Sequence, residues 1–150
     1  MKTLIPIILF VFSFSAFAQP NGKMKERIKA QKIAFITEQL DLTPDEAEKF
    51  WPIYNKFEAT TDKVRSEDLR TIKREMRDNP NLSDKEADAL LQQLMNAENK
   101  MHEAKLKLVN DLKKVIPSLK IIRLKAAEDE FNRRLLDRLK DMRQNRPKRN

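Results

Sequence analysis

The chain has 150 residues, of which 36% are charged, and it carries a net charge of +8, one glycine, one histidine and no cysteine. A single glycine excludes the Gly-rich loops in which backbone N–H groups approach a phosphate. A structural zinc site needs four Cys or His ligands, and thiol chemistry needs a cysteine, so this chain can form neither. Its single histidine has no placed nucleophile, which argues against a Ser/His/Asp triad. We expect no enzymatic activity and no cofactor.

Residues 1–18 have the pattern of a cleaved signal peptide. Lys2 gives a positive start, residues 4–14 form an almost unbroken apolar run, and residues 16–18 (Ala-Phe-Ala) match the A-x-A cleavage pattern. The apolar run is shorter than the roughly 20 residues that span a bilayer, and no later segment approaches that length. We expect an exported protein that is soluble after signal cleavage and does not insert into a membrane.

Positive charge is concentrated at the two ends of the remaining chain. Residues 19–150 contain 30 basic and 23 acidic side chains, which gives +7. Segments 19–40 and 123–150 carry +3 and +5, whereas 41–122 carries −1. Because an exported protein does not ordinarily meet nucleic acid, we expect no nucleic-acid partner.

Apolar residues recur at spacings of three and four along most of the chain after residue 18, and no useful stretch alternates with period two. This pattern predicts a single all-α domain of four helices over residues 19–142, followed by a basic disordered tail at 143–150. The first helix is expected at about 23–40 and ends at the turn formed by Asp41 and Leu42.

The second helix has a well-marked start. Thr43 can cap it, Pro44 suits the first helical position, and Glu46 completes a capping box. The helix should run to the Asn-Pro pair at 79–80, with a kink at 48–52 because Pro52 removes a backbone donor and clashes with the carbonyl four residues earlier. Its apolar face comprises Ala47, Phe50, Tyr54, Phe57, Thr61, Val64, Leu69, Ile72 and Met76.

The third and fourth helices follow from similar signals. Ser83 and Glu86 repeat the capping-box pattern and start a helix that runs until Pro117, after which Ser118 can cap the last helix. Helices two and three of roughly 33–35 residues are about 50 Å long, too long for a compact globule with a radius of gyration near 14 Å. They predict an elongated antiparallel hairpin, whose thin core predicts a homodimer.

Two groups of residues invite a functional interpretation. His102 has Glu98 four residues before it, but residue 106 is Leu106, so the H-E-x-x-H pattern fails and we expect no metal site. Four aromatic residues fall within eight positions: Phe50, Trp51, Tyr54 and Phe57. In one interpretation Phe50, Tyr54 and Phe57 anchor the core, with Trp51 partly covered. In the other interpretation, part of this cluster lines a surface that binds apolar segments of other proteins.

The segments Leu42-Thr43-Pro44-Asp45-Glu46 and Ile116-Pro117-Ser118-Leu119-Lys120 resemble the two LTxxQ motifs of the Spy/CpxP family, which includes sensor-like homologues associated with extracytoplasmic sigma factors. The motif positions are Leu42, Thr43, Glu46 and Ser118. Glu46 stands in place of the Gln of the first motif and keeps its capping role. The resemblance implies a cradle-shaped, four-helix antiparallel dimer in the periplasm that binds unfolded or misfolded envelope proteins without ATP.

The charge map favours the same function, since basic first and last helices would attract acidic client segments and exposed apolar side chains would then bind them. The candidate client-binding residues are Lys25, Arg27, Lys29, Lys32, Trp51, Arg123, Arg133, Arg134 and Arg138. Two other functions stay open. A regulatory or sensor module would bind one membrane sensor or anti-sigma protein, and a metal sensor would use His102 and Glu98.

Overall fold

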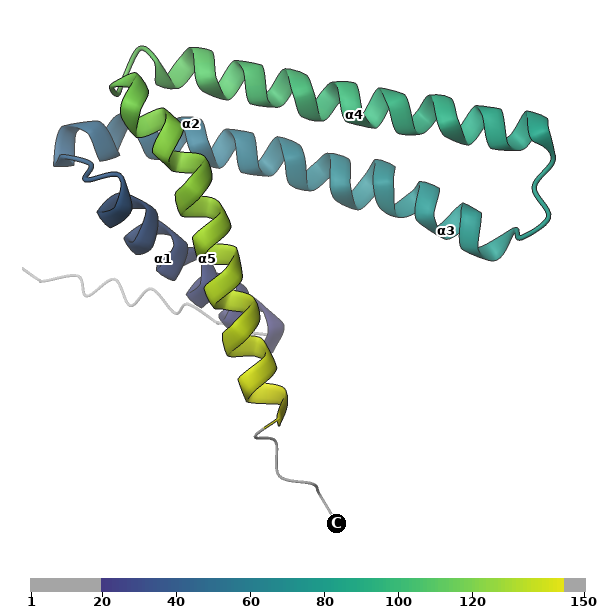
Figure 1. Ribbon diagram of the computed structural model, residues 1–150, viewed down its shortest axis with the longest axis horizontal. Coiled ribbons are helices and arrows are strands. Elements are labelled where there is room, and N and C mark those ends of the chain that lie inside the picture. The colour runs from purple at the N-terminus through teal and green to yellow at the C-terminus, as the bar shows by residue number, and fades with distance from the viewer. Residues whose placement is uncertain (1–19, 145–150) are drawn as a thin grey trace, which may run out of the picture.

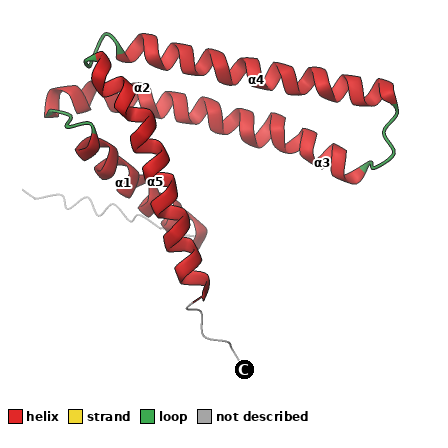
Figure 2. Cartoon of the chain, viewed as in Figure 1, coloured by secondary structure: helices red, strands yellow, loops and turns green. Residues whose placement is uncertain are grey.

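A computed structural model describes residues 20–144 as helices joined by short turns, with no strand in that range (Figure 1, Figure 2). The helices are α1 (Pro20–Gln39), α2 (Pro44–Lys63), the π-helical turn η1 (Val64–Leu69), α3 (Arg70–Asp78), α4 (Asp84–Leu112) and α5 (Ser118–Gln144). Because α2, η1 and α3 form one continuous rod, the prediction of an all-α fold with four long helices is confirmed.

The two ends of the chain fall outside this description. The expected signal peptide at 1–18 lies outside the described residues, as do residues 145–150 of the expected tail. Arg143 and Gln144, which we expected in the tail, are the last residues of α5. Among the described helices, none combines the length and the apolar character needed to cross a membrane.

The described helices form two arms that meet at an angle (Figure 1). In the hairpin arm, the rod formed by α2, η1 and α3 runs antiparallel to α4. In the α1–α5 arm, α1 and α5 run antiparallel to one another and leave the hairpin arm near the α4–α5 turn. The predicted antiparallel hairpin and elongated shape are therefore present in a single chain.

Both predicted capping boxes are confirmed. At the start of α2, Thr43 Oγ1 accepts the N–H of Glu46 at 3.2 Å, and Glu46 Oε2 accepts the N–H of Thr43 at 2.9 Å. At the start of α4, Ser83 and Glu86 exchange the same two bonds at 3.4 and 2.8 Å. Each box satisfies two backbone donors that the first helical turn leaves without partners.

The start of α5 differs from the expectation. Ser118 is itself the first residue of α5, and the carbonyl of Pro117 accepts the N–H of Ile121 at 3.3 Å. The capping position therefore falls one residue earlier than Ser118, on a proline whose side chain has no hydrogen-bonding group. The prediction that Ser118 caps this helix is wrong.

The second helix also departs from the expectation. The α-helix continues through Pro52, which donates no backbone hydrogen bond. A π turn follows at η1, where Arg70 N–H bonds to the carbonyl of Arg65. A π turn absorbs one extra residue, so Val64 and Ile72 are effectively two helical turns apart and both are buried. Met76, placed on the buried face by its spacing, is 58% exposed near the free end of the hairpin arm.

The main hydrophobic core lies where the two arms meet. It gathers buried side chains from α1, α2, α4, α5 and the turns between them: Ile36, Leu40, Leu42, Phe50, Tyr54, Leu108, Leu112, Ile116, Leu124 and Ala127. Phe50 and Tyr54 stack with their ring centroids 5.5 Å apart, and Trp51 is half-buried at their edge, where its Nε1 donates to Thr37. The interpretation of the aromatic cluster as the core anchor is confirmed for Phe50 and Tyr54, with Trp51 partly covered, whereas Phe57 is only half-buried and packs at the margin of the core.

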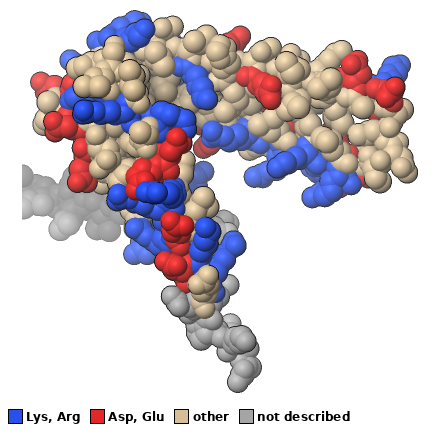
Figure 3. Space-filling view, in the orientation of Figure 1, with Lys and Arg blue, Asp and Glu red and all other residues tan. Residues whose placement is uncertain are grey.

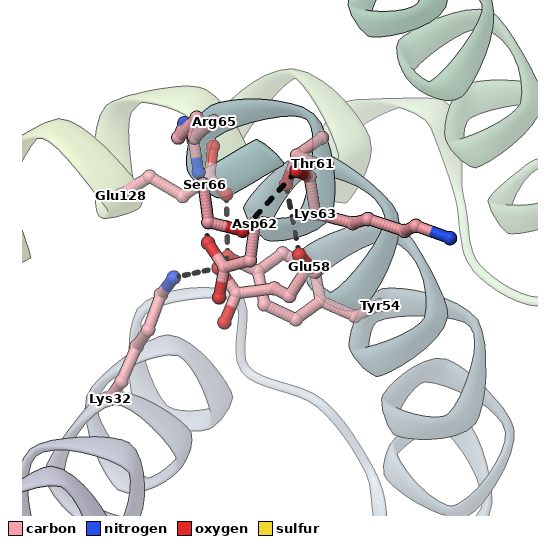
Figure 4. A network of polar contacts seen from close by, with 9 residues as sticks. All are labelled: Lys32, Tyr54, Glu58, Thr61, Asp62, Lys63, Arg65, Ser66 and Glu128. Carbon is pink, nitrogen blue, oxygen red and sulfur yellow. Dashed lines mark hydrogen bonds and ion pairs between the residues drawn. The ribbon is translucent and has the colours of Figure 1, made fainter. Parts of the chain in front are cut away.

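A polar network joins three helices beside this core (Figure 4). The hydroxyl of Tyr54 on α2 donates to Glu128 on α5 at 2.6 Å, and Lys32 on α1 donates to Glu58 on α2 at 2.5 Å. Burial, together with these carboxylates, raises the pKa of Tyr54 far above its ordinary value, so the phenol remains a proton donor. The network ties α1 and α5 to α2 at the point where the arms diverge.

A second polar contact ties the start of α5 to the end of α1. In the turn that follows α1, Asp41 has a φ of 47°, and the N–H of Leu42 donates to the carbonyl of Thr37 at 3.0 Å. The ammonium of Lys120 donates to the carbonyl of Asp41 and to Glu46 Oε2. One lysine of α5 therefore holds both the α1–α2 turn and the capping box of α2.

Candidate functional site

A groove runs along the seam of the α1–α5 arm. It consists of two adjoining hollows of about 360 Å³ each, which share Gln31, Leu135 and Arg138. We call it the arm groove. Its remaining lining residues are Lys23, Met24, Arg27, Ile28, Ala34, Phe35, Glu38, Phe131, Arg134, Leu139 and Met142.

The helical spacing of α1 and α5 places these residues on facing sides. Positions 24, 28, 31 and 35 of α1, and 131, 135, 139 and 142 of α5, recur at three and four residues and so share one face of each helix. Phe35 and Phe131 meet across the seam with ring centroids 5.9 Å apart. Among the helices of residues 20–144, only α1 and α5 form this arm, and no third one of them covers the groove (Figure 1).

The floor of the arm groove is apolar, and two methionines line its outer end. Ile28, Phe35, Leu135 and Leu139 are half-buried along it. Met24 and Met142 close the end farthest from the core and are 44% and 47% exposed. Methionine side chains have three rotatable bonds and a polarizable sulfur, so they adapt to apolar groups of different shapes.

The rim of the arm groove is predominantly basic. Lys23, Arg27, Arg134 and Arg138 line it, against one acidic side chain, Glu38. Arg138 donates to Gln31 across the seam at 2.8 Å. The groove thus combines an apolar floor with cationic edges, an arrangement that suits an apolar segment flanked by carboxylates.

Arg134 is held in place by two contacts. Its guanidinium carbon lies 5.0 Å from the ring centroid of Phe35, and its Nε donates to Glu130 at 2.7 Å. The hydrogen bond from Arg134 lowers the pKa of Glu130 below its ordinary value, and the charge of Arg133 adds to this effect. Since the contact with Glu130 is exposed to solvent, the guanidinium keeps donors for an incoming anion.

The structure separates the client-binding candidates into three groups. Arg27, Arg134 and Arg138 line the arm groove. Lys25, Lys29, Arg123 and Arg133 are exposed outside it, and Arg133 forms an ion pair with Glu130. Lys32 and Trp51 belong to the junction of the arms, where Lys32 pairs with Glu58 and Trp51 packs on the core.

Sequence reasoning missed the apolar part of this groove. Met24, Leu139 and Met142 carry the same spacing as the core positions, so they could be assigned to a buried stripe but not to an open one. To distinguish a buried stripe from an open one, it must be known which helices pack together. The groove is recognised only when α1 and α5 are seen to pack on each other with no third helix of residues 20–144 over their seam.

A second groove lies on the hairpin arm between α2, η1 and α4. Its apolar floor includes Phe57, Val64 and Leu108. Its charged rim is largely neutralised, because Lys100 pairs with Asp68 at 2.7 Å and Lys107 pairs with Asp111 at 2.8 Å. The arm groove therefore has the stronger attraction for an acidic segment.

His102 and Glu98 are exposed on successive turns of α4. Within residues 20–144, no three His, Cys, Asp or Glu side chains are grouped so that they could hold a metal ion. Comparison with protein-family models, with curated proteins and with solved structures finds no match to this chain.

Proposed function

We propose that this protein is an exported, ATP-independent chaperone whose arm groove binds acidic, partly apolar segments of unfolded or misfolded proteins. The observation that carries the proposal is the pairing of an uncovered apolar floor with a basic rim in one groove. Charge at the rim attracts and orients an acidic segment, and apolar burial then holds it. Release needs no nucleotide, because each contact is individually weak and exposed to solvent.

We also propose that the chain is a relative of the Spy/CpxP proteins and acts in the periplasm. Support for the relationship comes from the capping box at Thr43 and Glu46, which begins a long helical hairpin after a short first helix. The signal-peptide pattern of residues 1–18 supports export.

A homodimer is part of this proposal. Four large apolar side chains are exposed along the outer side of α4: Leu91, Met95, Leu106 and Val109. Their spacing places them on one face of the helix, where a second copy could cover them. Sedimentation velocity at micromolar concentration tests this part, since a monomer at every concentration would remove it without affecting the arm groove.

The function is tested by light scattering of a chemically denatured client that refolds with and without residues 19–150 of this protein, in the absence of ATP. We expect suppression of aggregation at low salt and weaker suppression at high salt, because salt screens the charges of the rim. No suppression at any salt concentration would refute the chaperone proposal. A pull-down from envelope extracts would then test for a single sensor or anti-sigma partner.

A further inference from the structure

The free end of the hairpin arm carries a compact group of cations that the arm groove does not use. Arg70, Lys73, Arg74 and Arg77 are all exposed on α3. At 100° of rotation per residue, these positions fall within about 100° of the helix circumference. We call this surface the α3 basic face. In Figure 3, Lys and Arg side chains gather along the edge of the hairpin arm toward its free end, where α3 lies.

The charges of this face are largely available to a partner. Within the described residues, Arg70, Lys73 and Arg74 form no ion pair, and Arg77 pairs only with its neighbour Asp78 at 2.9 Å. Glu75 is half-buried and, by its position, lies on the same side of α3 as Ile72, away from the cations. Four cations in two helical turns without an interleaved carboxylate repel one another, and a bound polyanion would relieve that repulsion.

The shape of the α3 basic face selects the kind of polyanion. The face is the convex side of a helix, and the hollows along the two arms do not include its residues. It has little apolar surface beyond Met76 at its margin. A polypeptide segment would find more to bind in the arm groove, whereas a convex cationic face fits anions that are displayed side by side on a surface.

Three of the four cations are arginines, whose planar guanidinium groups bind phosphate oxygens through two parallel hydrogen bonds. Because α3 lies far from the core at the free end of an arm, it can approach such a surface while the arm groove stays in solution (Figure 1). We propose that the α3 basic face binds the headgroup phosphates of an anionic lipid bilayer. This contact is peripheral, and it does not depend on the function proposed for the arm groove.

Vesicle flotation tests the proposal directly. Residues 19–150, which contain every described helix, are mixed with vesicles of phosphatidylcholine and phosphatidylglycerol at 3:1, or of phosphatidylcholine alone. The test variant is Arg70→Gln/Lys73→Gln/Arg74→Gln. The matched control, Lys85→Gln/Lys105→Gln/Lys113→Gln, removes the same charge from two exposed lysines of α4 and from Lys113, which directly follows it. None of the three forms an ion pair within the described residues.

Each basic residue near an anionic surface contributes roughly a factor of five to partitioning, so the triple α3 variant should bind on the order of a hundredfold more weakly. The α4 control should stay within a few-fold of the wild type, and neutral vesicles should not bind. Equal losses in the two variants would mean that only net charge matters, and would overturn the proposal. Unchanged binding of the α3 variant, or equal binding to neutral vesicles, would overturn it too.

Two further measurements keep the result interpretable. Far-UV circular dichroism and the fluorescence of Trp51 report whether each variant is folded. If the triple variant does not fold, the single variant Lys73→Glu replaces it in the test, and we expect it to bind the vesicles more weakly than the wild type. If the α3 variant loses binding to poly-glutamate but keeps its binding to vesicles, the face binds acidic protein and the proposal is wrong. Suppression of client aggregation should be unchanged in the α3 variant, which separates this inference from the proposed function.

Discussion

The guanidinium of Arg134 on α5 lies 5.0 Å from the centre of the Phe35 ring on α1, at the edge of the arm groove. The contact places a cation beside an apolar surface before any partner binds. Because Arg134 is already oriented by Phe35 and Glu130, little side-chain freedom is lost when it meets a carboxylate. The rim of this groove also keeps Lys23, Arg27 and Arg138 free of ion pairs within the described residues. In the hairpin-arm groove, by contrast, Lys100 and Lys107 are paired with Asp68 and Asp111.

Replacing the two methionines at the open end of the arm groove should separate binding from stability. Both side chains are about half exposed, so Met24→Ser/Met142→Ser should lower the free energy of unfolding by no more than about 1 kcal/mol. Suppression of client aggregation should fall several-fold, because the adaptable apolar surface is lost. The matched control is Ile122→Ser/Leu136→Ser on α5, which replaces two exposed apolar side chains outside the groove and should leave suppression unchanged. Equal activity of the double variant and the wild type would contradict the assignment of this end of the groove.

Removing the hydroxyl of Tyr54 should destabilise the junction of the arms. Tyr54→Phe deletes the 2.6 Å hydrogen bond to Glu128, and the expected cost is about 1.5 to 3 kcal/mol, the range for hydrogen bonds to charged groups. Urea unfolding followed by Trp51 fluorescence measures it. In a double-mutant cycle with Glu128→Gln, the two changes should be strongly non-additive. Additive costs would show that the Tyr54–Glu128 contact does not stabilise the fold.

The two phenylalanines at either end of the aromatic cluster should differ in their contributions. Phe50 is 0% exposed, so Phe50→Ala should cost about 3 to 5 kcal/mol. Phe57 is only partly buried and lines the hairpin-arm groove, so Phe57→Ala should cost about 1 to 3 kcal/mol. Equilibrium unfolding in urea compares the two variants. A cost for Phe57→Ala equal to that for Phe50→Ala would place both rings in the same closed core.

The stability of the protein should fall in acid. The hydrogen bond from Lys120, together with that from Thr43, holds the pKa of Glu46 below its ordinary value. A carboxyl group with a depressed pKa in the folded state stabilises that state above its ordinary pKa, and this contribution is lost as the pH falls through the folded pKa. Glu86, Asp111 and Glu130 are shifted in the same direction by Ser83, Lys107 and Arg134.

Thermal melts between about pH 6 and pH 3 measure this dependence. The wild-type melting temperature should decrease over that range, and Glu46→Gln should be less stable at pH 6 and less sensitive to acid. Glu103→Gln, which replaces an exposed carboxylate of α4 that forms no ion pair in the described part of the chain, is the control. A melting profile of Glu46→Gln that runs parallel to the wild type would show that Glu46 does not contribute to the acid dependence.

Local signals in the sequence predicted local structure well. Thr43 with Glu46 and Ser83 with Glu86 located two helix starts, because a capping box depends only on residues three positions apart. The buried positions of α2, which are Phe50, Tyr54 and Thr61, also followed from periodicity. The π turn at 64–69 could not be predicted this way, since one absorbed residue shifts the phase of α3 without changing the composition of the helix.

The features that define the candidate site depend on contacts between distant parts of the chain. Arg138 meets Gln31, 107 residues away, and Tyr54 meets Glu128, 74 residues away. Neither pairing has a sequence signature, so basic residues could be assigned to helices but not to a groove. The α3 basic face was missed for a different reason: the charges of residues 41–122 sum to −1, and this sum hides four cations that lie within residues 70–77.

The arm groove is tested most directly by measuring client affinity with fluorescence anisotropy. The client is a fluorescently labelled unfolded protein that is acidic and partly apolar, and its affinity is compared for two charge-reversed variants and the wild type. Arg27→Glu/Arg138→Glu reverses two cations of the groove rim. Lys105→Glu/Lys113→Glu, the α4 variant, reverses an exposed lysine of α4 and the exposed lysine that follows it, with the same change in net charge. We predict that the groove variant binds the client at least tenfold more weakly and that the α4 variant binds within about threefold of the wild type. Equal affinities for the two variants would contradict the assignment of the arm groove as the client-binding site.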